Sequence, residues 1–282
     1  MRKLRCSLAL LLLALAPAAI AQKPAVTSSA PPAPPVTAPL PVDDENARQA
    51  RQILDRMLKA LGGDAYLTYQ ARTEIGRTYG FYHGEPKGVG VQFWRFWRWP
   101  DKDRMELTKQ RDWIVIYDGD QGFETTFRGT RPMDKDDMKE YLERRPYSNE
   151  HVLRQWLKAP GTVLFYDGRT VAERKPAEKI TIMDARNRSV TFFVDADTHL
   201  PIKKTFTLRD PETRERSNIE EIYDNYRPIA AQGGVIQTPL SLAWKTDDWM
   251  TRQRFLNTVT YDPPMSASLF DPGPLNYDPK KK

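Results

Sequence analysis

The sequence predicts an α+β fold in which a large curved antiparallel sheet carries helices against one of its faces. Two observations favour this fold. Strand-like runs fill most of the chain with no helix of crossover length between most of them, and apolar residues recur with helical spacing in only two segments. The chain has 282 residues, of which 40% are hydrophobic and 28% charged, so it is long enough to bury a substantial core.

The two helical segments are residues 44–61 and 134–158. In the first, apolar residues recur three and four positions apart, and two glycines follow the last of them as a typical left-handed cap. Pro146 divides the second segment, and Ser148 is a suitable N-cap for its second half. Because the sheet is the only other surface in the chain that can bury their apolar stripes, we expect both segments to pack on it.

The strand-like runs are short, and turn residues separate them. Parallel strands need long crossover connections, so we expect an antiparallel sheet joined mainly by hairpins. The predicted strands are 71–83, 88–99, 103–109, 112–118, 122–128, 162–167, 170–174, 178–184, 189–195, 200–209, 215–226, 235–246 and 250–261.

Several predicted strands are apolar on both faces. In 88–99, Phe93 and Trp97 point to one side, and Trp94 and Phe96 point to the other. Such a strand either lies in a packed aromatic core or lines an apolar cavity, and periodicity alone does not decide between the two. The residues predicted to line such a cavity are Phe93, Trp97, Trp99, Trp113, Val115, Phe192, Phe206, Leu242 and Trp244. The lid predicted over it, from the second helical segment, presents Met138, Tyr141, Leu142, Val152, Leu153 and Trp156.

The first 21 residues have the parts of a secretory signal peptide: a basic head, an apolar run from Leu8 to Leu15, and an A-x-A motif that predicts cleavage after Ala21. A membrane anchor, the alternative, needs about 20 apolar residues, and this run is much shorter. Residues 22–43 contain seven prolines and almost no charge, which predicts a disordered tether. We expect a single domain at 44–273 and a basic C-terminal tail at 274–282.

The formal charge of +6 comes from the two ends of the chain. Arg2, Lys3 and Arg5 lie at the start of the chain, and three lysines lie at its end. Of the 43 basic residues, 37 remain when these six are set aside, and they balance the 37 acidic residues. A protein that binds nucleic acid needs clustered Lys and Arg that face the phosphate backbone. The neutral body of this chain therefore argues against a nucleic-acid partner.

The residues that usually carry catalysis are scattered along the chain. His83, His151 and His199 have no motif neighbour that would make them a general base or a metal ligand. Cys6, the only cysteine, lies in the predicted signal peptide, so the mature chain has no thiol nucleophile and no zinc–thiolate site. The DGDQG segment at 118–122 lacks the later ligands of a calcium loop and is typical of a hairpin turn. We therefore predict no enzymatic activity, no metal and no cofactor.

A set of short motifs recurs in a characteristic order. The motifs are LGGDAYL (61–67), YDGDQGFE (117–124), VDADTHLPIKKTF (194–206), EIYDNYR (221–227), GGVIQTPLSL (233–242) and NTVTYDPPMSASLFDPG (257–273). With this order, the chain from 44 to 273 resembles the LolA/LolB-like superfamily of periplasmic lipoprotein carriers, in particular the outer-membrane lipoprotein-sorting proteins. The resemblance implies a half-open barrel, in which helices form a lid over an apolar cavity on a strongly bent sheet. It also implies acyl-chain binding without catalysis.

Together these features predict an exported, periplasmic protein that binds the acyl chain of a lipid or lipoprotein and acts as a carrier in outer-membrane lipoprotein sorting. We do not expect an integral membrane protein. Two alternatives stay open. The same sheet could serve as an envelope-stress sensor that recognises an envelope membrane protein, or the protein could be a secreted hydrolase whose site the sequence does not reveal.

Overall fold

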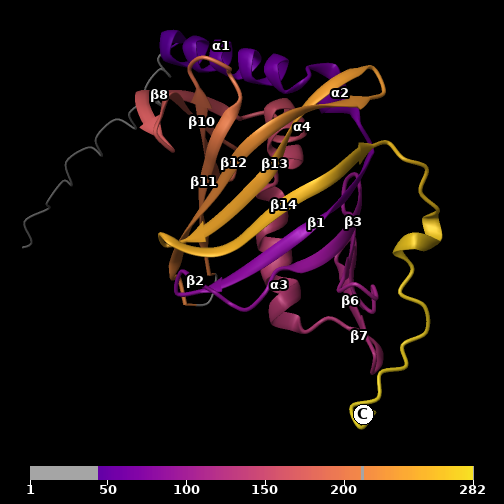
Figure 1. Ribbon diagram of the computed structural model, residues 1–282. Coiled ribbons are helices and arrows are strands. Elements are labelled where there is room, and N and C mark those ends of the chain that lie inside the picture. The colour runs from indigo at the N-terminus through magenta and orange to yellow at the C-terminus, as the bar shows by residue number, and fades with distance from the viewer. Residues whose placement is uncertain (1–43, 211–212, 282) are drawn as a thin grey trace, which may run out of the picture. The chain divides into compact units, whose positions relative to one another are not determined.

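The computed structural model describes residues 44–210 and 213–281 (Figure 1). Its main element is one 14-stranded sheet in which the paired strands are antiparallel. The sheet is open, because its two end strands, β7 (Gly129–Pro132) and β8 (Val163–Ala172), do not pair with each other. An open antiparallel sheet with few helices confirms the predicted fold class. The predicted signal peptide and tether, residues 1–43, lie outside the described residues.

Most strands that are neighbours in the sheet are also neighbours in sequence, as expected of hairpins. The order along the sheet is β7-β6-β5-β4-β3-β1-β14-β13-β12-β11-β10-β9-β8, and β2 pairs with β1. The first and last strands therefore lie side by side in the middle of the sheet. The remaining strands are β1 (Ala71–Tyr82), β2 (Glu85–Pro86), β3 (Val91–Arg98), β4 (Lys102–Leu107), β5 (Trp113–Asp118), β6 (Gln121–Thr126), β9 (Lys175–Met183), β10 (Ser189–Asp195), β11 (Pro201–Arg209), β12 (Arg216–Ala231), β13 (Gly234–Thr246) and β14 (Trp249–Tyr261).

The strands differ from the predicted ranges in a few places. The two runs predicted at 162–167 and 170–174 form the single strand β8, which a register shift between Tyr166 and Gly168 interrupts. Such a shift interrupts the alternation of apolar and polar residues but does not end the strand. For this reason the sequence pattern predicts two short strands where the structure has one. The short strands β2 and β7 were not predicted, and β12 continues beyond the predicted end at 226 to Ala231.

The helices are α1 (Asp44–Leu61), α2 (Asp64–Thr68), α3 (Lys135–Arg144) and α4 (Asn149–Arg154), with 3-10 turns η1 (Arg145–Tyr147), η2 (Trp156–Lys158) and η3 (Ala267–Phe270). Three of the α-helices lie in the predicted segments, whereas the short helix α2 was not predicted. Pro146 lies in η1, between α3 and α4. The Ser148 hydroxyl accepts a hydrogen bond from the backbone N–H of His151, which confirms the predicted N-cap of α4.

The main core lies between the helices and the sheet, and strands β3, β4 and β8 to β14 contribute to it. In Figure 1, α1 runs across the ends of the strands, while α3 and α4 lie behind β13 and β14 in this view. The apolar stripe of α1 packs with β8 and β9, and α4 with η2 adds three further buried side chains to the same cluster. Buried members of this cluster include Ile53, Leu54, Met57, Val152, Leu153, Trp156, Ile180, Ile182, Val190, Phe192 and Phe206.

The C-terminal segment follows the opposite end of the sheet. Phe270 of η3 is buried, and η3 contacts β4 and β5. Farther along, the backbone N–H groups of Asn276 and Asp278 donate hydrogen bonds to Thr130 and Arg128, beside the edge strand β7. These bonds satisfy carbonyl groups at an edge that would otherwise be free to pair with another chain.

Candidate ligand-binding cavity

A cavity of about 560 Å³ lies between the helix-bearing face of the sheet and α3. Strands β1 and β3 to β6 on one side and β11 to β14 on the other contribute to its walls. Its apolar and aromatic lining consists of Leu61, Tyr66, Met105, Trp113, Val115, Tyr117, Met133, Tyr141, Pro201, Tyr223, Tyr226, Pro239, Leu242, Trp244, Leu256 and Tyr261. Arginine and carboxylate side chains complete the wall, so the cavity is richer in charge than the apolar hollow that the sequence predicts.

The structure divides the nine residues predicted to line a cavity into two groups. Trp113, Val115, Leu242 and Trp244 do line it. The other five pack into the core or against it and do not contribute to the wall: Phe93, Trp97, Trp99, Phe192 and Phe206. Phe93 and Phe192 have no exposed surface at all. Contact between any of the nine and a ligand stays a prediction.

The two helices of the predicted lid differ in how they pack. Val152, Leu153 and Trp156, from α4 and η2, are buried in the main core. In contrast, α3 buries none of its residues. Its Tyr141 lines the cavity, whereas Met138 and Leu142 lie on another side of the helix, in a shallow apolar groove. The structure therefore makes α4 an anchor and α3 the loosely packed wall of the cavity.

A buried lysine holds α4 on the sheet. Lys204 has no exposed surface, and its Nζ donates hydrogen bonds to the carbonyl oxygen of Tyr147 (2.7 Å) and to Oδ1 of Asn149 (2.9 Å). The same ammonium forms an ion pair with Glu221 at 2.8 Å. A buried charge needs partners of this kind, and here they tie the start of α4 to β11 and β12.

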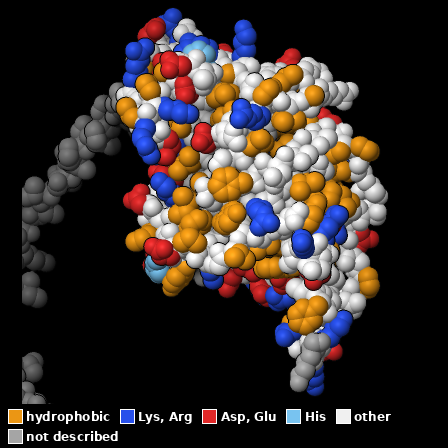
Figure 2. All heavy atoms as spheres, in the orientation of Figure 1, with side chains coloured by type: hydrophobic (Ala, Val, Ile, Leu, Met, Phe, Trp, Pro, Cys, Tyr) orange, Lys and Arg blue, Asp and Glu red, His pale blue; other side chains and the backbone are white. Residues whose placement is uncertain are grey.

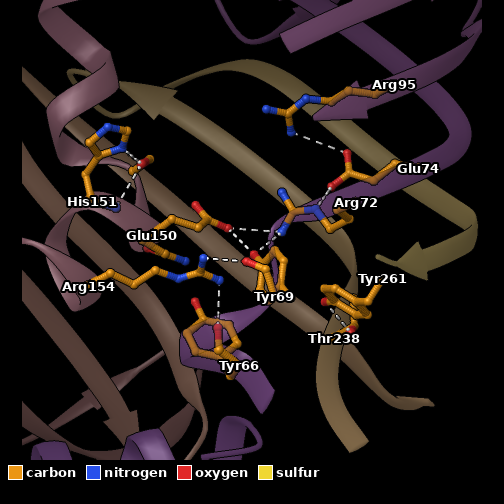
Figure 3. Close-up of polar contacts among 12 residues, drawn as sticks. Tyr66, Tyr69, Arg72, Glu74, Arg95, Glu150, His151, Arg154, Thr238 and Tyr261 are labelled. Carbon is orange, nitrogen blue, oxygen red and sulfur yellow. Dashed lines mark hydrogen bonds and ion pairs between the residues drawn. The ribbon is translucent and has the colours of Figure 1, made fainter. Parts of the chain in front are cut away.

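A polar network joins α4 to β1 on the cavity wall (Figure 3). Glu150 Oε1 accepts hydrogen bonds from the Tyr69 hydroxyl (2.6 Å) and from Arg72 Nη1 (3.1 Å). Burial by itself would raise the pKa of Glu150, but Arg72, the Tyr69 hydrogen bond and Arg154 outweigh it and lower this pKa to about 2. Arg154 donates to the carbonyl oxygens of Tyr66 and Tyr69, both at 2.7 Å, so the network also fixes α2.

The network continues across the sheet through strand pairing. Arg72 Nε lies 2.8 Å from Glu74, and Arg95 lies 3.4 Å from the other oxygen of Glu74. Arg95 also contacts both oxygens of Asp103, with Nη2 at 2.7 Å and Nε at 2.9 Å. Each of the five charged residues Arg72, Glu74, Arg95, Asp103 and Glu150 therefore has a partner of opposite charge.

Sequence reasoning missed these charged residues, although the alternation contains the signal. Side chains two positions apart on a strand share a face, so the pattern that places Phe93 and Trp97 on the helix-bearing face places Arg95 there too. The segment RQRFL likewise places Arg252, Arg254 and Leu256 together, and all three line the cavity. In the register of the sheet, Arg252 lies opposite Trp244 and Arg254 opposite Leu242.

Residues 44–210 and 213–281 contain no group of three or more His, Cys, Asp or Glu side chains placed to hold a metal ion. Over the same ranges, no helix has the length and apolar character that crossing a bilayer requires. On the face shown in Figure 2, basic and acidic side chains are interspersed with apolar ones.

Solved structures share the fold of this protein, an open antiparallel sheet that carries helices on one face. A DUF1329 family protein from Desulfovibrio piger has a TM-score of 0.52 at 12% sequence identity, with 80% of this chain and 97% of that chain covered. A domain assigned to outer membrane lipoprotein sorting, from Vibrio parahaemolyticus, has a TM-score of 0.50 at 7% identity, with the same coverage of 80% and 97%. No family model and no curated protein matches the sequence. The structural likenesses confirm the predicted resemblance at the level of the fold.

Proposed function

We propose that the protein is an exported carrier that binds an acyl chain of a lipid or lipoprotein in the cavity beneath α3 and performs no catalysis. The observation that carries this proposal is the cavity itself, bounded on one side by the sheet and on the other by a helix with no buried residue. The fold, shared with a domain assigned to lipoprotein sorting, supports the same function. The signal peptide predicted at 1–21 supports a periplasmic location.

The size of the cavity suits such a ligand. A volume of about 560 Å³ lies within the range of small-molecule sites, which is about 300–1,000 Å³. Transfer of an acyl chain of about 16 carbons out of water gains about 12 kcal/mol, before the costs of ordering the chain and displacing α3 are subtracted. The aromatic and aliphatic side chains of β5 and β13 offer the apolar contact that this transfer needs.

A carrier must also release its cargo. None of the residues of α3 is buried, so its displacement exposes little apolar surface of its own. We propose that α3 moves to admit and release the acyl chain, while α4 stays fixed by its buried side chains and by Lys204. This division of roles fits a carrier between two envelope membranes in outer-membrane lipoprotein sorting.

The test is to express the full chain, purify the exported product without detergent, and examine it by native mass spectrometry for bound lipid. The same preparation is titrated with a fluorescent fatty acid. Leu242→Phe and Val115→Phe place extra volume in the cavity and should weaken this binding, whereas Val171→Phe, at an exposed position on β8, should leave it unchanged.

Two results would overturn the proposal. The first is a protein that carries no lipid and does not bind the fatty acid. The second is equal binding by the cavity variants and by the Val171→Phe control, which would place the fatty acid elsewhere. Capture of a specific envelope membrane protein by lipid-free protein would instead favour the sensor function.

A further inference from the structure

Two arginines on β14 face the cavity without an acidic partner. Arg254 is only 7% exposed; its Nε has no hydrogen-bond partner, and its Nη2 has only the sulfur of Met105, at 3.7 Å. Among the described residues, Arg252 has neither an ion pair nor a hydrogen-bond partner, and its guanidinium lies 4.5 Å from the ring centroid of Trp244. The guanidinium of Arg254 lies 5.4 Å from the same ring.

The carboxylates that line the cavity have other partners. Glu74 and Asp103 pair with Arg72 and Arg95, and Glu150 also pairs with Arg72. In the same way, Glu221 pairs with Lys204, Glu140 with Arg144, and both Glu124 and Asp134 with Arg131. Of the lining carboxylates in the described part of the chain, only Asp137 has no partner, and it lies on α3, a helix with no buried residue.

Burial of a guanidinium group without an acidic partner is energetically unfavourable. Removal of a charge from water is unfavourable unless an opposite charge or hydrogen-bond acceptors replace the water, and an aromatic ring does so only in part. Burial and the neighbouring charges of Arg252 and Arg95 lower the pKa of Arg254 to about 9. This pKa still leaves the guanidinium charged at neutral pH, so the cavity holds two cations that lack acceptors.

An oxyanion supplies what these cations lack. Carboxylate and phosphate oxygens accept charge-assisted hydrogen bonds from guanidinium groups, often from two nitrogens at once. The cross-strand neighbours of the two arginines, Leu242 and Trp244, together with Leu256 on β14, offer apolar contact directly beside them. A ligand that contacts both the guanidinium groups and the apolar side chains therefore needs an acidic head group and an apolar chain.

We propose that Arg252 and Arg254 bind the acidic head group of the acyl ligand, a carboxylate or phosphate oxyanion, so that the cargo is an anionic amphiphile. This inference rests on the proposed function and specifies its ligand class. The head group lies on β14 against the guanidinium groups, and the acyl chain extends from there along the apolar wall.

The experiment compares oleate with oleyl alcohol, which has the same chain and no charge, on the full chain by isothermal titration calorimetry. Hydrogen bonds to charged groups are worth about 10- to 100-fold in affinity, so oleate should bind about tenfold or more tightly than the alcohol. Arg254→Met and Arg252→Met should each reduce this preference and leave oleyl alcohol binding nearly unchanged. Arg254→Lys should retain part of the preference, and Arg77→Met, at an exposed position on β1, should retain all of it.

A second readout separates ligand binding from a structural role. Because Arg254 is buried without an acidic partner, Arg254→Met should raise the thermal unfolding midpoint of the ligand-free protein while it weakens oleate binding. A lower midpoint together with equal losses for both ligands would mean that Arg254 supports the fold, and would overturn the inference.

The remaining outcomes are distinct. If neither oleate nor oleyl alcohol binds, the proposed function fails and the inference fails with it. If both bind equally well and Arg254→Met changes neither, the carrier function stands and the acidic head group is excluded. Binding of inorganic phosphate that depends on Arg254, without any preference for oleate, would identify a site for a free anion and overturn the assignment to a lipid head group.

Discussion

The ring of Tyr141 on α3 lies flat against the ring of Tyr117 on β5, with 3.6 Å between the centroids and 8° between the planes. Near this stack, Arg145 donates to the carbonyl oxygen of Gly119 at 2.6 Å and pairs with Asp120 at 2.7 Å. On the other side of the cavity, Lys139 of α3 pairs with Asp210 at 3.1 Å. These contacts join α3 to both sides of the cavity without burying any of its residues.

We therefore expect Tyr141→Ala to free α3 while the fold stays intact. An aromatic pair contributes about 0.5–1.5 kcal/mol beyond its buried area, so global stability should fall only slightly. Amide hydrogen exchange in 135–144 should become faster, and exchange in the core strands should not change. Tyr141→Phe retains the ring and serves as the control. Unchanged exchange of α3 in Tyr141→Ala would show that other contacts hold this helix.

The buried ion pair of Lys204 and Glu221 gives a second prediction. Lys204→Met removes the cation that pairs with Glu221 and contacts Asn149 and the carbonyl oxygen of Tyr147, and leaves the Tyr223 hydroxyl as the remaining partner of Glu221 and Asn149. Loss of one member of a buried pair costs about 3–5 kcal/mol, which urea unfolding followed by circular dichroism can measure. Lys175→Met is the control, because Lys175 is exposed on β9 and should cost less than about 1 kcal/mol. Similar costs for both variants would contradict the role assigned to Lys204.

Gly76 on β1 provides a third prediction. A Cβ atom at this position would lie 2.1 Å from the carbonyl oxygen of Phe255, at a bulge in the pairing of β1 with β14. Because backbone atoms would have to move, Gly76→Ala should destabilise the protein by about 1–3 kcal/mol. Gly80→Ala on the same strand is the matched control, since no atom lies within 4 Å of its Cβ position. Equal unfolding midpoints for the two variants would show that the bulge adjusts easily.

The antiparallel pairing of most strands was predictable because hairpins are local. The prediction of each strand rests only on the alternation of apolar and polar residues within it and on the turn residues that follow it. Both signals lie within about ten residues of sequence. The N-cap of α4 was predictable for the same reason, since Ser148 bonds to the N–H of His151 three residues later. The short strand β7 was missed because four residues carry too little alternation.

The composition of the cavity wall was harder to predict because it depends on distant pairing. Alternation places Phe93 and Phe206 on the helix-bearing face, but it does not show that helices cover that part of the sheet and turn both residues into core. Arg95 is tolerated there only because Glu74 and Asp103, on two other strands, lie beside it. Strict alternation along β11 would place Ile202 and Phe206 on one face, but the register shifts between Phe193 and Val194 beside Ile202, and Ile202 packs in a small cluster with Ala172 and Ala177.

The carboxylate of Glu150 makes the stability of the protein depend on acidity. Its pKa of about 2 in the folded protein lies below the ordinary value of 4.5, so folding favours the charged form. The resulting stabilisation is fully present above pH 4.5 and is lost as the pH falls toward 2. From this difference in pKa, it amounts to about 3 kcal/mol.

We expect Glu150→Gln to remove this part of the pH dependence. The variant should be less stable than the wild type at neutral pH, because Arg72 then keeps only Glu74 as a carboxylate partner, and the difference should shrink as the pH falls from 4.5 toward 2. Urea unfolding across this pH range measures it, with Glu215→Gln, an exposed residue outside the network, as the control. If the stability curves of Glu150→Gln and the wild type stay parallel across the range, the charge on Glu150 does not stabilise the contact between α4 and β1.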